Sequence, residues 1–156
     1  GFKALGKGSK IKIDDGKLSF DVSKKVNNNQ LEIKSKSDGI IAHNKGVNFP
    51  NIILDVPVLT NKDISDIKIG IELDVDWFAL SFVRSKSDIK SIKKILKQYN
   101  SEKPIIAKIE KPEAVQELES IIKAFDGILV ARGDLGVEMG YEMVPIIQRR
   151  IIRYIP

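Results

Sequence analysis

The chain has 156 residues, of which 42% are hydrophobic and 30% are charged. This composition is typical of a protein that folds around an apolar core, and it argues against disorder. The lack of Cys and the single His exclude disulfides and thiolate metal sites, and they argue against a multi-histidine metal site. No apolar run approaches the roughly 20 residues that a membrane-spanning helix needs, so we expect no membrane partner.

The net charge of +5 and the pI near 9.3 invite a nucleic-acid-binding interpretation. However, the Lys residues are spread along the chain, and the densest group lies in SDIKSIKKILKQYN at residues 87–100. In that segment Lys alternates with Ile and Leu at helical spacing, which is typical of the solvated face of an amphipathic helix. We therefore expect no nucleic-acid partner.

The first 47 residues have the alternating pattern of short β-strands. Asp14-Asp15-Gly16 separates the first two strands and is a strong signal for a hairpin turn. Short strands at this spacing predict a small antiparallel sheet or barrel. Fewer than 50 residues bury little core, so we expect this half to belong to a larger unit. The expected strands are 10–13, 17–22 and 31–35.

From Pro50 onward the pattern changes to strands that alternate with helices. The apolar runs of strand length start about 25 residues apart, with helical periodicity between them. This alternation predicts a parallel sheet covered by helices. The expected strands are 76–82, 104–109 and 127–130.

Three helix starts carry recognisable signals. Thr60 with Asp63 three residues later resembles a capping box, and Ser87 is a candidate N-cap for the next helix. Pro112 suits the first turn of a third helix, because a proline at that position loses no helical hydrogen bond.

Three strand–helix units fit either a (β/α)8 barrel or an open doubly wound sheet. The Gly-rich phosphate loop of open-sheet nucleotide binders is missing, which favours the barrel. A complete barrel needs about 250 residues, and the chain has room for three or four of its eight units. We therefore expect an α/β fold that contains part of a TIM barrel and comes from a longer protein.

The candidate site lies at the carboxyl ends of these strands, where parallel α/β proteins place their active sites. Lys108 and Glu110 end one strand, and the period of two puts their side chains on the same face. Asp134 follows the next strand, and two carboxylates from adjacent strands can hold Mg²⁺. A lysine beside that metal would neutralise charge on a phosphoryl group. Ser81 near the end of an earlier strand offers a polar contact.

The same residues also have structural interpretations that need no ligand. A Lys-x-Glu sequence at a strand end is often an ion pair, and Gly-Asp is a common turn. Asp14-Asp15-Gly16 alone indicates only a turn, and His43 is expected at the surface. The Gly133 and Gly136 positions are expected to let the backbone approach a ligand closely.

A set of short motifs in a fixed order decides between these interpretations. They are IKIDDGKLSF, NKGVNFP, VDWFALSFVRS, AKIE and GILVARGDLGVE. Each is unspecific alone, but their ordered combination resembles the pyruvate kinase family along nearly the whole chain. The resemblance implies phosphoryl transfer from phosphoenolpyruvate to ADP, giving pyruvate and ATP, on a (β/α)8 barrel with a small inserted β-barrel lid. Residues 1–47 then match part of the lid (B) domain, and 48–156 match strands 4–6 of the barrel (A) domain.

The resemblance also implies roles for individual residues. Lys108 matches the lysine that stabilises the phosphoryl group during transfer, and Glu110 and Asp134 match the ligands of an essential Mg²⁺ or Mn²⁺ ion. Ser81 would contact the substrate, together with Lys108. The backbone that would receive the substrate carboxylate comprises Ala131, Arg132, Gly133 and Asp134.

In the lid, Lys45 matches a lysine that reaches the nucleotide phosphates, and Asp15 matches a carboxylate near the nucleotide. The family's potassium ligands precede this chain, so K⁺ is expected only in a full-length parent. That parent is expected to be a homo-oligomer, with a tetramer as the family's form, and to be cytoplasmic or in an organelle such as a plastid. Lys111 replaces a frequent Asn, and residues 137–140 lack the frequent proline; both are interpreted as tolerated variation.

Two alternatives stay open at this point. The chain could be a non-catalytic fragment or degenerate homologue that acts as a binding or structural module. It could also belong to another Mg²⁺-dependent barrel enzyme that acts on enolates, such as a lyase or aldolase, although this leaves the lid motifs unexplained. Under the favoured interpretation the parent is active, and this chain alone is expected to be inactive.

Overall fold

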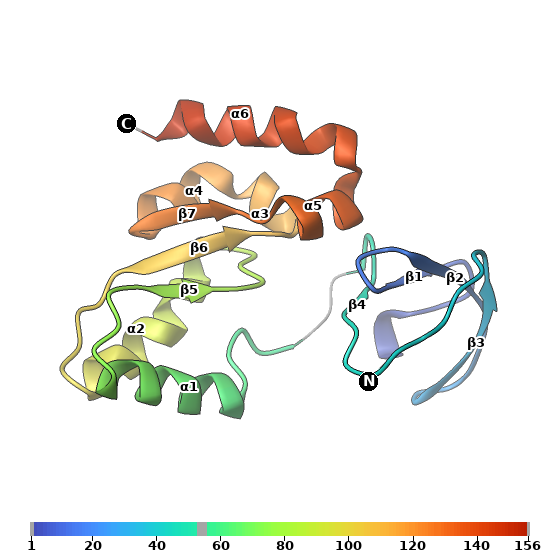
Figure 1. Cartoon of the computed structure of the whole chain (residues 1–156), viewed down its shortest axis with the longest axis horizontal. Helices are drawn as coiled ribbons and strands as arrows, with labels where there is room; N and C mark the ends of the chain where they lie inside the picture. The colour runs from blue at the N-terminus through green and yellow to red at the C-terminus, as the bar shows by residue number, and fades with distance from the viewer. Residues whose placement is uncertain (1, 53–55, 156) are drawn as a thin grey trace.

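The computed structural model describes residues 2–52 and 56–155 and has a mixed α/β fold (Figure 1). These residues form a four-stranded antiparallel sheet near the N-terminus and a three-stranded parallel sheet with helices around it. The two parts lie side by side. Within the described residues, no helix has the length and apolar character needed to cross a bilayer.

The antiparallel sheet has the strand order β3-β2-β1-β4. Asp14, Asp15 and Gly16 form the β1–β2 turn with positive φ angles, which confirms the hairpin prediction. A small apolar cluster built around Leu18 and Phe20 covers one face. The strands are β1 (Lys10–Ile13), β2 (Leu18–Asn27), β3 (Gln30–Ser35) and β4 (Val47–Asn48), preceded by the 3-10 turn η1 (Phe2–Ala4).

The parallel sheet has the order β5-β6-β7, as the alternation of strands and helices predicts. On β6, Ala107 and Ile109 are fully buried against the helices, whereas Lys108 points to the other face. Neither sheet closes into a barrel within the described residues. The mixed α/β character of the prediction is confirmed, and the assignment to part of a TIM barrel stays a prediction. The strands are β5 (Phe78–Leu80), β6 (Ile105–Ile109) and β7 (Gly127–Val130).

The helices contribute the rest of the main core. Ile92 and Leu96 of one helix, and Leu118 and Ile121 of another, are almost fully buried, as their helical spacing predicts. The α-helices are α1 (Asn61–Glu72), α2 (Ile89–Gln98), α3 (Pro112–Gln116), α4 (Leu118–Ala124), α5 (Arg132–Met139) and α6 (Val144–Tyr154). The remaining 3-10 turns are η2 (Lys86–Asp88) and η3 (Tyr141–Met143).

The helix starts confirm two predictions and correct one. Thr60 caps α1 through a reciprocal box: its N–H donates to Asp63 Oδ2 at 2.7 Å, and Asp63 N donates to Thr60 Oγ1 at 3.2 Å. The hydrogen bond from the Thr60 N–H is the main cause that lowers the pKa of Asp63. Pro112 opens α3 as expected.

The prediction of Ser87 as an N-cap is wrong. Ser87 lies inside η2, the 3-10 turn that precedes α2. The cap is instead built around the buried Asp88, which accepts hydrogen bonds from the backbone N–H groups of Arg84 at 2.7 Å and Ser85 at 3.0 Å. A carboxylate forms stronger hydrogen bonds with backbone N–H groups than a neutral hydroxyl does. The helical segment therefore begins with η2, before Ser87, which the sequence suggested as the N-cap.

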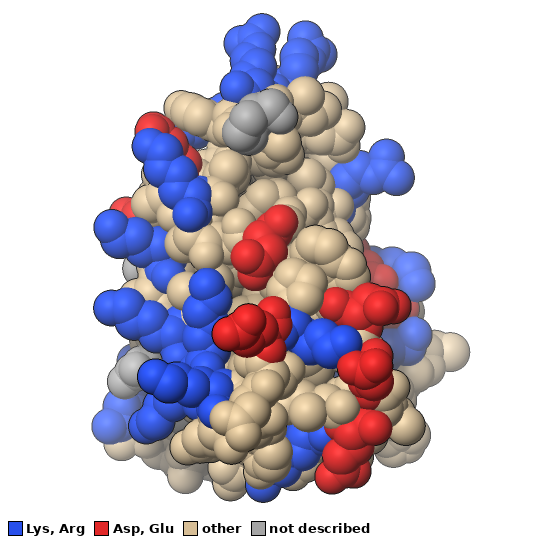
Figure 2. Space-filling model, turned by 90° about the vertical axis from the view of Figure 1, so that its left-hand side faces the viewer, with Lys and Arg blue, Asp and Glu red and all other residues tan. Residues whose placement is uncertain are grey.

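The surface charge does not gather into one basic face. Figure 2 shows most Lys and Arg at the left and top of the visible face, with others at the right, and most Asp and Glu at its centre and right. On α2, Lys90, Lys93, Lys94 and Lys97 are exposed and the Ile side chains are buried. This arrangement matches the solvated helix face expected from the sequence.

Candidate active site at the ends of the parallel strands

The structure brings three of the predicted site residues together. Lys108 Nζ donates a hydrogen bond to Ser81 Oγ at 2.9 Å and forms an ion pair with Glu110 Oε1 at 2.6 Å. Lys108 and Glu110 come from the end of β6, and Ser81 follows β5, so the group lies at the carboxyl ends of adjacent strands. The prediction that Lys108 and Glu110 share a face is confirmed.

Glu110 is the buried centre of this group, with 1% of its surface exposed. Its Oε2 accepts a hydrogen bond from Phe82 N at 3.1 Å. Its Oε1 is buried and near Lys108 Nζ, but the contact is not aligned as a hydrogen bond. That oxygen therefore keeps a lone pair available for a further electropositive partner.

The backbone at Phe82 is unusual, because its φ of 56° lies in the left-handed region. For a bulky residue this conformation costs about 1–2 kcal/mol. It accompanies the hydrogen bond from the Phe82 N–H to Glu110, and Phe82 as a whole residue is 57% exposed. Lys111 Nζ lies 5.8 Å from the centre of that ring.

The segment after β7 differs from the sequence expectation. Arg132, Gly133 and Asp134 begin the helix α5 after the strand. Ala131 N donates to Ile109 O at 3.2 Å, so this N–H is already used and is not free for a substrate carboxylate. The next three N–H groups lie in the first helical turn, where a helix offers no acceptor for them. The hydrogen bond from Ala131 N to Ile109 O also holds the start of α5 beside the end of β6, next to Glu110.

Gly133 and Gly136 lie on the same helix in different surroundings. A Cβ at Gly133 would meet no atom within 4 Å, which leaves open space at the first turn of α5. A Cβ at Gly136 would overlap the ring of Tyr141. Gly136 therefore serves the packing of α5 against η3, which corrects the expectation that it lets a ligand approach.

This contrast gives a stability prediction. Gly136→Ala is expected to lower the free energy of unfolding by about 1–3 kcal/mol, because the Tyr141 ring must move to admit a methyl group. The matched Gly133→Ala variant is expected to be neutral or slightly more stable, since Ala favours a helix over Gly by about 1 kcal/mol. Urea unfolding followed by circular dichroism measures both values. Equal effects of the two substitutions would contradict the packing role of Gly136.

The two predicted nucleotide-binding residues do not join the Lys108 group. Lys45 Nζ forms an ion pair with Asp14 Oδ1 at 3.0 Å, and Asp15 is exposed at the β1–β2 turn. The hydrogen bond from Lys45, followed by that from Lys17, lowers the pKa of the Asp14 carboxyl. Within the described residues, no hydrogen bond or ion pair connects Lys45 or Asp15 with Ser81, Lys108 or Glu110.

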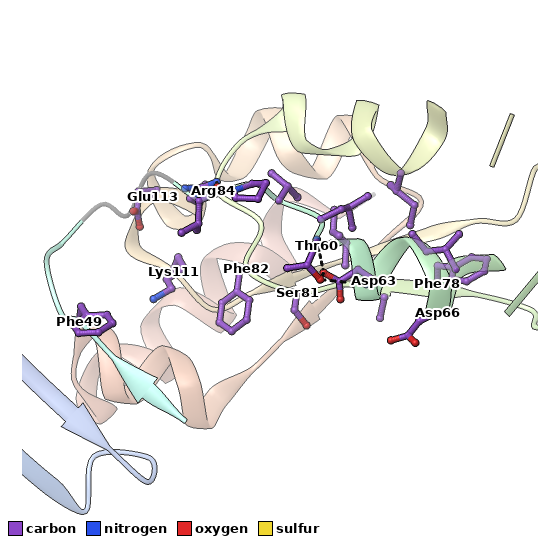
Figure 3. Close-up of a pocket in the computed structure, with 18 of the residues that line it drawn as sticks. Phe49, Thr60, Asp63, Asp66, Phe78, Ser81, Phe82, Arg84, Lys111 and Glu113 are labelled. Atoms are coloured by element: carbon purple, nitrogen blue, oxygen red, sulfur yellow. Dashed lines mark hydrogen bonds between the residues drawn. The ribbon is translucent and has the colours of Figure 1, made fainter. Parts of the chain in front are cut away.

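A pocket with a volume of about 830 Å³ lies beside the site (Figure 3). It follows the free edge of β5 and is lined mainly by apolar side chains, with Ser81 and Phe82 where it meets the site. Lys108 and Glu110 are not part of its lining. The pocket therefore adjoins the Lys108 group through Ser81 without including Lys108 or Glu110.

The described residues hold no group of three or more His, Cys, Asp or Glu side chains that could bind a metal by themselves. The two candidate carboxylates are Glu110 and Asp134, and Asp134 is partly buried as the third residue of α5. Mg²⁺ commonly takes one or two protein carboxylates and completes its shell with water and substrate oxygens. The buried Oε1 of Glu110 fits such a role.

The sequence alone does not single out Glu138. It is buried, and its Oε1 contacts Lys111 Nζ at 2.6 Å and Asn48 Nδ2 at 3.0 Å. Lys111 is thus more than tolerated variation, because it provides the charge partner of a buried carboxylate. The sequence feature that could have pointed to Glu138 is its position as a single Glu within the otherwise uncharged segment LGVEMG.

Comparison with known proteins identifies the family of this chain. The family described as "Pyruvate kinase, barrel domain" matches residues 2–155. The chain belongs to the pyruvate kinase family. It is 45% identical over 146 residues to a pyruvate kinase of Corynebacterium efficiens, which covers 94% of this chain and 31% of that relative. It is 43% identical over 153 residues to a pyruvate kinase of Thermotoga maritima, covering 97% of this chain and 32% of the relative.

A third pyruvate kinase, numbered 2 in Synechocystis, is 43% identical over 146 residues, which is 93% of this chain and 25% of that relative. The chain therefore spans about a third or less of the length of the pyruvate kinases that it matches.

Proposed function

We propose that the chain supplies a lid sheet and strands four to six of the (β/α)8 barrel in a pyruvate kinase that transfers a phosphoryl group from phosphoenolpyruvate to ADP. Residues 1–47 are assigned to the lid and 48–156 to the barrel, with β4 at the boundary. The observation that carries the proposal is Lys108, held between Ser81 and buried Glu110 at the ends of adjacent parallel strands. Family membership supports it.

Lys108 is proposed to stabilise the phosphoryl group during transfer. The oxygens of a transferring phosphoryl group share negative charge, and a fixed ammonium near them lowers the barrier. Ser81 and Glu110 hold the Nζ atom in one place, so little side-chain freedom is lost when the substrate arrives. The enolate that leaves then takes up a proton and becomes pyruvate.

Glu110 and Asp134 are proposed to hold Mg²⁺ or Mn²⁺. A metal bound there would supply positive charge to the enolate and phosphoryl oxygens. The buried Oε1 of Glu110, which lacks an aligned hydrogen bond, supports this assignment. Phe82 N orients the carboxylate by holding its other oxygen at 3.1 Å.

The first turn of α5 is proposed to receive the substrate carboxylate. The N–H groups of Arg132, Gly133 and Asp134 have no acceptor inside the helix, and the N-terminal end of a helix favours an anion. The open space at Gly133 allows a ligand to approach the backbone. Ala131 is left out of this donor set, because its N–H is bonded to Ile109 O.

The remaining assignments follow from family membership. Lys45 and Asp15 are proposed to meet the nucleotide after the lid moves, since among the described residues neither has a hydrogen bond or ion pair with Lys108. We further propose that K⁺ binds to residues outside this chain, and that the whole protein is a cytoplasmic homo-tetramer. The alternative is a non-catalytic module, in which the Lys108–Glu110 pair is only structural.

The test is phosphoenolpyruvate-dependent formation of ATP from ADP by the protein that carries this chain, with and without Mg²⁺. We expect turnover that requires the divalent metal and disappears when it is chelated. A folded protein that binds phosphoenolpyruvate and Mg²⁺ but forms no ATP would overturn the proposal and favour the non-catalytic module.

A further inference from the structure

Glu138 connects the two sheets through a single carboxylate oxygen. It lies near the end of α5 and is buried, with 8% of its surface exposed. Its Oε1 is 2.6 Å from the Nζ of Lys111, which follows β6, and 3.0 Å from the Nδ2 of Asn48 in β4. One oxygen thus accepts from the parallel-sheet part and from the antiparallel sheet at once.

The neighbouring residue makes a second connection. Lys12 Nζ in β1 donates to Val137 O at 2.6 Å. Lys12 and Asn48 are direct partners in the β1–β4 ladder. This cross-strand pair therefore donates hydrogen bonds to two successive residues of α5, Val137 and Glu138. A lysine at the carboxyl end of a helix is also favoured by the helix dipole.

The contact between the two sheets depends on each partner of Glu138, because the Glu138 carboxylate is charged and buried. A buried carboxylate is stable only when it is paired and hydrogen-bonded. Lys111 supplies the opposite charge, and Asn48 supplies the hydrogen bond that depends on where the antiparallel sheet lies. Removing the sheet from α5 therefore leaves Glu138 with fewer donors and exposes it to water.

The same helix carries the candidate substrate and metal residues at its other end. Asp134 and Glu138 lie one turn apart within α5. A change in how the antiparallel sheet holds the end of α5 therefore acts on an element that also positions Asp134.

We propose that Glu138 is a positioning residue that docks the antiparallel sheet onto the parallel-sheet part, with Lys111 as its counter-charge and Asn48 as its donor. The docking itself stands on the contacts of Glu138, and only its effect on substrate rests on the proposed function. Lid docking and the position of Asp134 are thereby coupled through one short helix.

The experiment measures the distance between the two parts with paired spin labels and pulsed electron resonance. The chain has no Cys, so labels can be placed at Asn28→Cys in the β2–β3 turn and Lys94→Cys on α2, both exposed positions. Asn48→Asp sets a second carboxylate against Glu138 in place of a donor. It is expected to lower the ratio of docked to undocked molecules roughly tenfold, as the loss of a buried charged hydrogen bond implies.

The decisive variant combines Asn48→Asp with Glu138→Gln, which exchanges the donor and the acceptor across the same contact. This exchange is expected to restore most of the docked population, because a side-chain amide again faces a carboxylate. Lys111→Gln is expected to lower the docked population as well. Lys123→Gln serves as the control, since its pair with Glu119 has the same 2.6 Å length but is exposed.

An unchanged distance distribution in folded Asn48→Asp, or no recovery in the exchanged double variant, would overturn the docking role. Circular dichroism checks folding, and if Asn48→Asp does not fold, an unchanged distribution in Lys111→Gln overturns it instead. The measurement needs no substrate. If the label-to-label distances change in the variants but the protein has no pyruvate kinase activity, the docking role stands and only the proposed function is overturned.

Discussion

Lys108→Met is expected to reduce the rate of phosphoryl transfer by a factor of about 10³, the loss seen when one fixed electrostatic contact to a transition state is removed. The substitution keeps the length and apolar part of the side chain but removes the ammonium that contacts Ser81 and Glu110. It also leaves a buried carboxylate without its charge partner, which is expected to cost about 3 kcal/mol of folding free energy. Steady-state kinetics and urea unfolding measure the two effects separately.

Two further variants separate chemistry from stability. Lys108→Arg keeps the positive charge and is expected to recover most of the folding free energy, but not the rate, because the guanidinium is planar and differently placed. Lys123→Met removes an exposed lysine with the same 2.6 Å ion-pair length, and is expected to leave the free energy of unfolding nearly unchanged, because solvent screens an exposed pair. Near-normal turnover by folded Lys108→Met would refute the assigned role.

Glu110→Gln is expected to weaken the binding of Mn²⁺ or Mg²⁺ by about 100-fold or more. The amide has nearly the same shape, so the hydrogen bond from Phe82 N can persist while the negative charge is lost. Because an amide oxygen is a poor replacement for a carboxylate in the proposed site with two charged ligands, the metal affinity is expected to fall more than the stability. Calorimetric titration of the metal measures the change.

The control for this prediction is Glu119→Gln, which alters a carboxylate that also pairs with a lysine at 2.6 Å but lies on the surface of α4. Its metal affinity is expected to equal that of the unmodified protein. Asp134→Asn should weaken metal binding as Glu110→Gln does, and the double variant should add little, because either loss already opens the site. Unchanged affinity in Glu110→Gln would remove this residue from the metal site.

The sequence predicts the grouping of Lys108, Glu110 and Ser81 because periodicity fixes the geometry there. Lys108 and Glu110 share a face because a strand alternates, and Ser81 meets them because parallel strands end at one edge. The three parallel strands and the Asp14-Asp15-Gly16 hairpin follow from the same local rules. These predictions depend only on residues that are close in sequence or paired on adjacent strands.

The errors arise where residues distant in sequence decide the outcome. The loss of Ala131 as a free donor depends on a hydrogen bond to Ile109 in the neighbouring strand β6. Gly136 is explained by the Tyr141 ring packed against it, not by a ligand. The Asn48–Glu138 contact joins residues 90 positions apart, which no local pattern reports.

The left-handed backbone at Phe82 restricts which residues evolution can place there. Gly adopts this conformation without cost, and Asn or Asp adopts it more easily than most, whereas a β-branched residue is strongly disfavoured. The backbone conformation at Phe82 therefore limits which residues can replace it, whatever the chemistry of their side chains. A relative with Val or Ile at this position must have changed the path of the chain after β5, and with it the donor that orients its equivalent of Glu110.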